Sequence, residues 1–251
     1  MVYQLPAATE HSVLDVAGRS QLVLFGELHG TSEVPNMLVA LLSKLEALGY
    51  RGLALEVPFD MREHLAAWAS GRAAQPPAFF SQPSKDGRGN QQALALAASA
   101  AALGYELLCF DQGPGQPADT WAERDRWMAV NLLEQWRRLC EGARVVAICG
   151  SLHARLSPDQ GVGRWLRKAA SGGQTQWPSL AGWLREREPT LAVASIDVRF
   201  AAGGYFNMGE RTIYRRPGAR AEAWVEPGTR ASTFELWLPR ATPATFSAPP
   251  T

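Results

Sequence analysis

Two histidines and three acidic residues stand where apolar, strand-like runs of this sequence end. The run QLVLFG leads into Glu27 and His29, GLALEV contains Glu56, YELLCF ends at Asp111, and RVVAICG is followed by His153. In open α/β sheets, ligands bind in the crevice beyond the carboxyl ends of the strands. If these strands are parallel neighbours, the side chains converge on one edge of the sheet. The pattern therefore predicts an active site at that edge.

Glu27 and His29 are two residues apart, so in an extended segment their side chains point the same way. A carboxylate and an imidazole in one small volume suit general acid–base catalysis or coordination of a divalent ion. Alternatively, the two residues only cap the helix that follows. Glu56 ends a buried strand, where a carboxylate needs a cation, a hydrogen-bond donor or water. Its structural alternative is a solvated strand end or an ion pair.

His153 and two residues of a long predicted helix extend this set. His153 follows the fourth strand, and its place at the same edge favours a functional role over a structural one. Arg124 and Asn131 are seven residues apart and share a helix face. An arginine near a helix start is unfavourable for the helix dipole, which suggests that Arg124 binds an anion or a carboxylate of the site. The alternative is a solvated charge cluster.

The stretch 71–90 is rich in Pro, Gly and Ser and has no hydrophobic period, so it is predicted to be a loop. Loops of this length in compact domains are often lids or binding loops. The loop contains Asp86 and Arg88 on either side of a glycine. Arg88 is therefore expected either in an exposed turn or closing over a substrate.

The segments that position these residues alternate between strand-like and helix-like patterns. Strands are predicted at 21–26, 52–57, 105–110, 144–150 and 190–198, and helices at 32–48, 60–70, 93–103, 119–141, 164–170 and 179–187. This repetition predicts a single α/β domain over residues 1–242, with a largely parallel central sheet flanked by helices on both faces. Short antiparallel β additions are expected at 212–214, 223–225 and 234–238, and a flexible tail at 243–251.

Composition argues against several classes of protein. The 251 residues carry a net charge of +1, so there is no electrostatic footprint for nucleic acid or an anionic membrane. The first twenty residues lack the apolar core of a signal peptide, and no apolar stretch approaches the roughly 20 residues that span a bilayer. Cys109, Cys140 and Cys149 show no C-x-x-C spacing, and the first and last are expected to be buried. A cytoplasmic location is expected, and the oligomeric state stays open.

Five short motifs in order resemble the erythromycin esterase/ChaN/Tiki superfamily: FGELHGTSE, LALEVP, DGRGN, ERDRWMAVN and ICGSLHA. The resemblance covers about residues 21–154 and implies an α/β fold with one pocket. The matching site residues are Glu27, His29, Glu56 and His153, with Arg88 and Arg124 in the arginine motifs. Members include macrolide-lactone esterases, haem-binding lipoproteins and membrane-tethered metal-dependent proteases, so the reaction is less firmly implied than the fold. The spacing of Glu27 and His29 is one residue shorter than in the macrolide esterases.

These observations support a hydrolase that cleaves an ester, lactone or amide bond of a small-molecule or peptide substrate. In this hypothesis His29, with Glu27 or Glu56, activates a water molecule, and His153 is a second acid–base group or a ligand. The substrate or its oxyanion is expected to be bound by Arg88, Asp111, Arg124 and Asn131. A divalent metal ion is an optional part of the hypothesis, held by Glu27, His29, Glu56 and His153.

Two rival functions remain open at this point. One is a ChaN-like binding protein, in which a histidine ligates haem iron and the arginines meet the propionates of haem or the charge of another acidic ligand. The other is an interaction or toxin-type effector domain that keeps the fold without its chemistry.

Overall fold

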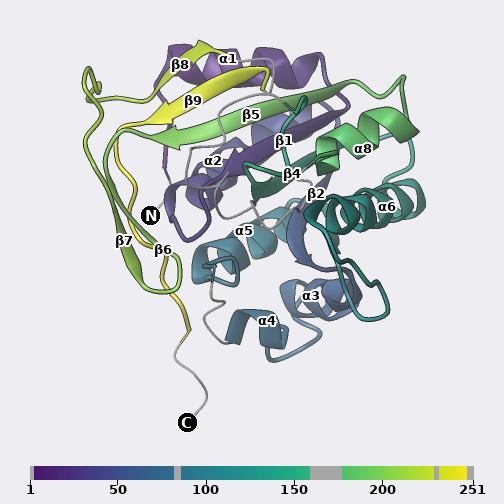
Figure 1. Ribbon diagram of the computed structural model, residues 1–251. Helices are drawn as coiled ribbons and strands as arrows, with labels where there is room; N and C mark the ends of the chain where they lie inside the picture. The colour runs from purple at the N-terminus through teal and green to yellow at the C-terminus, as the bar shows by residue number, and fades with distance from the viewer. Residues whose placement is uncertain (1–2, 82–85, 159–176, 229–231, 248–251) are drawn as a thin grey trace.

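A seven-stranded sheet with helices on both faces forms the centre of the molecule (Figure 1). The computed structural model describes residues 3–81, 86–158, 177–228 and 232–247. The strand order is β3-β2-β4-β1-β5-β9-β8, and only β8 runs antiparallel to its neighbour. The strands are β1 (Leu22–Glu27), β2 (Tyr50–Pro58), β3 (Glu106–Asp111), β4 (Arg144–Gly150), β5 (Val193–Phe200), β8 (Trp224–Pro227) and β9 (Phe234–Leu238). A separate antiparallel pair consists of β6 (Gly203–Phe206) and β7 (Glu210–Ile213).

The helices form two layers. They are α1 (Ala7–Gly18), α2 (Glu33–Ala47), α3 (Arg62–Ala69), α4 (Ala78–Ser81), α5 (Gln91–Ala102), α6 (Trp121–Leu139) and α8 (Leu180–Arg187), with a 3-10 turn η1 (Phe59–Met61) before α3. Figure 1 shows α6 and α8 side by side on one face of the sheet. The other face is covered by α2 and α5, with α1 beside α2.

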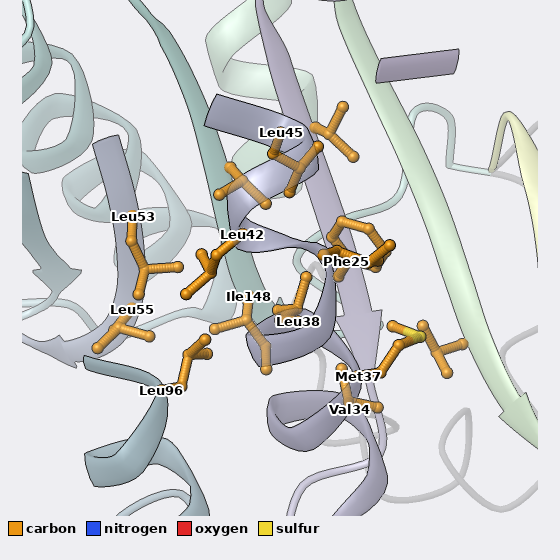
Figure 2. Packing of buried hydrophobic residues seen from close by; sticks show 14 of the residues in the cluster. Phe25, Val34, Met37, Leu38, Leu42, Leu45, Leu53, Leu55, Leu96 and Ile148 are labelled. Carbon is orange, nitrogen blue, oxygen red and sulfur yellow. The ribbon is translucent and has the colours of Figure 1, made fainter. Parts of the chain in front are cut away.

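Alternate residues of the central strands enter the two layers, as the period of an extended chain requires. In β1, Val23 and Phe25 pack in the cluster with α2, whereas Leu22 and Leu24 pack in the cluster with α6 and α8. Figure 2 shows Leu38, Leu42 and Leu45 of α2 lying over Phe25 and Ile148 of the sheet. Because both faces are covered, the inner strands are apolar until their last residues.

The structure confirms the predicted α/β class and the predicted strands of the sheet. It adds α1, which the sequence analysis did not predict, and it places the four-residue α4 within the predicted loop 71–90. The helix predicted at 164–170 lies outside the described residues, as do residues 82–85 of that loop. The additions at β6–β7 and β8 are antiparallel, but β9 pairs parallel with β5, contrary to expectation.

Residues 243–247, predicted to belong to a flexible tail, are partly bound to the rest of the chain. Pro243 forms a β-bridge with Thr31, and the Ala244 N–H donates to the Gly30 carbonyl at 2.9 Å. Thr245 exchanges hydrogen bonds with the Gln92 side chain. The segment is ordered because the loop after β1 and the start of α5 satisfy its backbone groups.

No helix in the described part of the chain is both long and apolar enough to cross a membrane.

Candidate functional site

Four strand ends place the candidate site on one edge of the sheet. Because β4 pairs with both β1 and β2, and β3 pairs with β2, their carboxyl ends lie in the order β3-β2-β4-β1. Asp111 ends β3, Gly150 ends β4 and Glu27 ends β1. The register of β2 against β3 shifts between Leu55 and Pro58, so the regular pairing is interrupted at Glu56. The structure therefore brings together side chains that the sequence separates by more than a hundred residues.

Glu56 is the centre of this cluster. Its side chain is buried, and its Oε1 accepts hydrogen bonds from Arg88 Nη1 at 3.1 Å and Arg124 Nη2 at 2.8 Å. Its Oε2 accepts from the Gly150 N–H at 2.7 Å and lies 3.4 Å from His29 Nε2. Burial alone would raise the pKa of Glu56, but His153, His29 and Arg88 hold it well below its usual range. Glu56 is therefore an ionised anchor that fixes the cations around it.

Glu27 and His29 form the predicted pair. His29 Nδ1 lies 3.0 Å from Glu27 Oε1, so one side of the imidazole faces each glutamate. The other carboxylate oxygen, Glu27 Oε2, is buried and has no hydrogen-bond partner among the described residues. Burial raises the pKa of Glu27, while its hydrogen bond and its attraction to His29 oppose this effect. Burial lowers the pKa of His29, but Glu56 and Glu27 outweigh that effect and raise it to about 10.

Arg88 and Arg124 each form ion pairs with more than one carboxylate of the site. Arg88 donates from Nε to Asp86 at 2.7 Å, and its Nη1 also bonds Asp111. Arg124 donates from Nε to Asp111 at 2.9 Å. Both side chains remain partly exposed, by 18% and 22%, so their edges are reachable from solvent. Burial lowers the pKa of each guanidinium, but Glu56 and Asp111 reverse this and raise it, so both stay charged.

His153 is held from both sides. Its Nδ1 lies 2.5 Å from Asp125 Oδ1, and its Nε2 faces Arg124 Nη1 at 3.2 Å. The other oxygen of Asp125 accepts the N–H of Leu180 at the start of α8. The indole of Trp121 stacks on the imidazole with ring centres 5.8 Å apart and an interplanar angle of 15°. These contacts fix the orientation of the His153 ring.

Two of the predicted substrate-binding residues, Asp111 and Asn131, are buried and hold other parts of the site in place. Asn131 is 3% exposed, and its amide donates to the Asp111 carbonyl at 3.1 Å and pairs with Gln116. Asp111 is 4% exposed and holds both arginines. Their observed contacts are with the protein, so Asn131 fixes the end of β3 and Asp111 fixes the guanidinium groups.

The sequence analysis did not identify Asp125, Asp86 or Trp121 as site residues. A signal for Asp125 was present, because it falls on the helix face that carries Ala122, Met128 and other buried apolar positions. An acidic residue among apolar positions requires a buried partner. Asp86 and Trp121 gave no such signal, since their contacts depend on how a loop and a helix start pack against distant strands.

Backbone contacts hold the loops that carry His29 and Arg88 against each other. Gly30 has a φ of +78°, and a Cβ there would lie 1.9 Å from the Phe206 carbonyl oxygen. Gly87 has a φ of +85°, and a Cβ there would lie 2.6 Å from Gly30 Cα. The Phe206 N–H of β6 also donates to the Gly30 carbonyl at 3.0 Å. Only glycine permits this approach of three segments.

The arranged donors do not fit a divalent metal ion. Both nitrogens of His29 face carboxylates, both oxygens of Glu56 accept protein hydrogen bonds, and His153 Nε2 faces a guanidinium. Within the described residues, no group of three or more His, Cys, Asp or Glu side chains is arranged to hold a metal. Haem iron meets the same obstacle, since it needs an imidazole nitrogen with an available lone pair.

Similarity to known proteins is found in the fold and not in the sequence. No family model and no curated protein matches the sequence. Among solved structures, a mutant of the erythromycin esterase EreC in its open conformation aligns with a TM-score of 0.68 at 9% identity, covering 94% of this chain and 95% of that one. A succinoglycan biosynthesis protein aligns with a TM-score of 0.67 at 10% identity, over 93% and 91% of the two chains.

The type III effector HopBA1 also aligns, with a TM-score of 0.57 at 14% identity over 93% of this chain and 95% of the other. ChaN of Campylobacter jejuni, solved with haem, reaches a TM-score of only 0.47 and adds nothing to the assignment. Proteins with this architecture thus carry different activities in their names. The structural comparisons confirm the predicted fold: the chain has the same α/β architecture as the erythromycin esterase EreC.

Proposed function

We propose that the protein is a hydrolase that cleaves an ester, lactone or amide bond with a water molecule activated at Glu27. The observation that carries this proposal is the unpartnered, buried Glu27 Oε2 beside His29. A buried carboxylate oxygen without a donor is costly, and an ordered water is its natural partner. Such a water would sit next to a charged imidazole, at the edge of the sheet where ligands bind in this type of fold.

The pKa directions assign the roles within the pair. His29, with a pKa of about 10, carries a proton on each nitrogen at neutral pH and is therefore suited to donate a proton. Glu27, with a raised pKa, is a stronger base than an ordinary carboxylate. This division refines the expectation that His29 itself takes the proton from water.

In the proposed reaction, every bond and proton is accounted for within one turnover. The oxygen of water bonds to the acyl carbon as Glu27 accepts a proton from that water. The bond to the leaving oxygen or nitrogen breaks as His29 donates to that atom the proton on Nε2, whose contact with Glu56 is the longer one at 3.4 Å. Glu27 then releases its proton to solvent, and Nε2 of the 17% exposed His29 takes one up, which restores both groups. Arg88 and Arg124 present partly exposed positive edges towards which an oxyanion can form.

A kinetic comparison tests this proposal. Wild type, Glu27→Gln and His29→Ala are assayed with a panel of esters, lactones and short peptides, beside the control His11→Ala, whose residue is exposed on α1. We expect kcat to fall by about 10²–10⁴-fold in both site variants and to stay unchanged in the control, because general acid–base groups contribute about that much. Full activity of Glu27→Gln, or an inert wild type over the whole panel, would contradict the proposal.

A cytoplasmic location belongs to the same proposal. Cys109, Cys140 and Cys149 are free and buried, which agrees with a reducing compartment.

A further inference from the structure

Trp121 has an unusual position for a large apolar side chain. It is 39% exposed, and it is one of four large hydrophobic residues that the described part of the chain leaves exposed, with Leu103, Met208 and Tyr214. Of the four, it is the one whose ring stacks on a histidine of the candidate site. Five other tryptophans donate their indole N–H to described residues, but no such bond is made by Trp121 within that part of the chain.

The helix places Trp121 beside the groups that face solvent in the site. Trp121, Arg124 and Asp125 lie at i, i+3 and i+4 at the start of α6, so they are neighbours on one face. Arg124 reaches Glu56, and Glu56 reaches His29, which is itself 17% exposed. These contacts link the start of α6, which carries Trp121, to the Glu27–His29 pair.

The charges of the site do not favour an anionic substrate. The cluster holds five carboxylates, namely Glu27, Glu56, Asp86, Asp111 and Asp125. The positive groups near them are Arg88, Arg124, His29 and Arg155, and Arg155 interacts with Asp125. Arg88 contacts Glu56, Asp86 and Asp111, and Arg124 contacts Glu56 and Asp111, so no surplus of positive charge is left to select an anion.

We propose that Trp121 is a substrate-binding residue that stacks on an uncharged ring, aromatic or sugar-like, of the molecule that the site hydrolyses. The inference deepens the proposed hydrolase function and rests on it. An exposed indole face attracts the π face or the C–H face of a ring, and its N–H can bond a ring hydroxyl. The nearly balanced charge cluster next to it accepts a neutral acyl group without a penalty from like charge.

The first test compares matched substrates. Straight-chain esters and ring-bearing esters with the same reacting carbonyl are assayed with wild type, Trp121→Leu and the control Trp127→Leu. Leucine keeps apolar packing against His153 but removes the stacking face. We expect Trp121→Leu to raise KM about tenfold for the ring-bearing esters, to leave straight-chain KM unchanged, and to preserve kcat for both. Trp121→Phe should restore most of the preference, and a carboxylate on the ring should weaken binding to wild type.

Equal changes for both kinds of ester in Trp121→Leu would overturn the inference, because they would mean that Trp121 only supports His153. The second test does not depend on turnover. Calorimetric titration with an uncleavable aryl ketone and an uncleavable alkyl glycoside should show binding to wild type that Trp121→Leu loses and Trp127→Leu keeps. If no ester is cleaved but this binding pattern appears, the hydrolase proposal fails and the ring site stands. If esters are cleaved and neither probe binds to wild type, the ring site fails alone.

Discussion

His29 should make the stability of the fold depend on pH in a defined window. Two carboxylates contact its ring, Glu27 at 3.0 Å and Glu56 at 3.4 Å, and they outweigh the effect of burial and raise its pKa from 6.5 to about 10. Because the folded pKa lies above the unfolded one, the protonated imidazole stabilises the native state fully below about pH 6.5. This stabilisation is lost as the pH rises towards 10.

The size of the effect follows from the shift. At about 1.4 kcal/mol per pKa unit, the difference between 6.5 and about 10 sets an upper limit of roughly 5 kcal/mol on the contribution of His29 to the free energy of unfolding. Since Glu27 and Glu56 titrate together with His29, and the ring is 17% exposed, we expect about 2–3 kcal/mol in practice. His29→Gln removes this titrating group.

Urea unfolding of both proteins between pH 6 and pH 10 measures the effect. The stability advantage of wild type over His29→Gln should shrink by about 2–3 kcal/mol from pH 6.5 to pH 10, while the exposed control His11→Ala tracks wild type. Other groups that titrate near pH 10 affect all three proteins alike, so the difference isolates His29. If wild type and His29→Gln lose stability in parallel over this range, the raised pKa and the ion pairs assigned to His29 are wrong.

Four further outcomes are expected. Asp125→Asn should lower kcat about 10²-fold with little change in KM, because it releases the ring of His153, which the sequence analysis predicts to be a second acid–base group, from its fixed orientation; a changed KM with normal kcat would argue against this role. Arg124→Ala should lower the free energy of unfolding by about 3–5 kcal/mol in denaturant titrations, since it leaves Glu56 and Asp111 with less compensation. Exhaustive chelation should leave turnover unchanged, and a Soret titration with haem should show no saturable shift; activity that returns only with added Mn²⁺ would restore the metal hypothesis.

Much of the fold could be predicted because the spacing of apolar residues along the chain indicates which positions are buried. The runs that became β1, β2, β3 and β4 are apolar on both faces, as a covered parallel sheet requires. The helix α1 was missed because its apolar positions are few and it buries only Thr9, Val13 and Ala17. The direction of β9 was missed because alternation of side chains predicts a strand but carries no information on which way its neighbour runs.

For the candidate site, too, local features of the sequence could be predicted but contacts between distant segments could not. Glu27, Glu56 and His153 could be found because each interrupts or follows an apolar strand, a local signal. The pairing of Arg88 with Asp111, and the stacking of Trp121 on His153, could not be predicted, since each joins segments whose separation along the chain gives no hint of contact. The sequence therefore indicated the location of the site but not which of its charges are already compensated.

The contacts around Gly30 tie the site to the order in which the chain is made. The loop after β1 is synthesised before Phe206 and Ala244, and its Gly30 carbonyl accepts hydrogen bonds from the N–H groups of both residues. A nascent chain that has emerged only as far as α8 already contains Glu27, His29, Glu56 and His153. It lacks the strand and the C-terminal segment that hold the His29 loop in place. The His29 loop can therefore gain these two hydrogen bonds only after Phe206 and Ala244 have been synthesised.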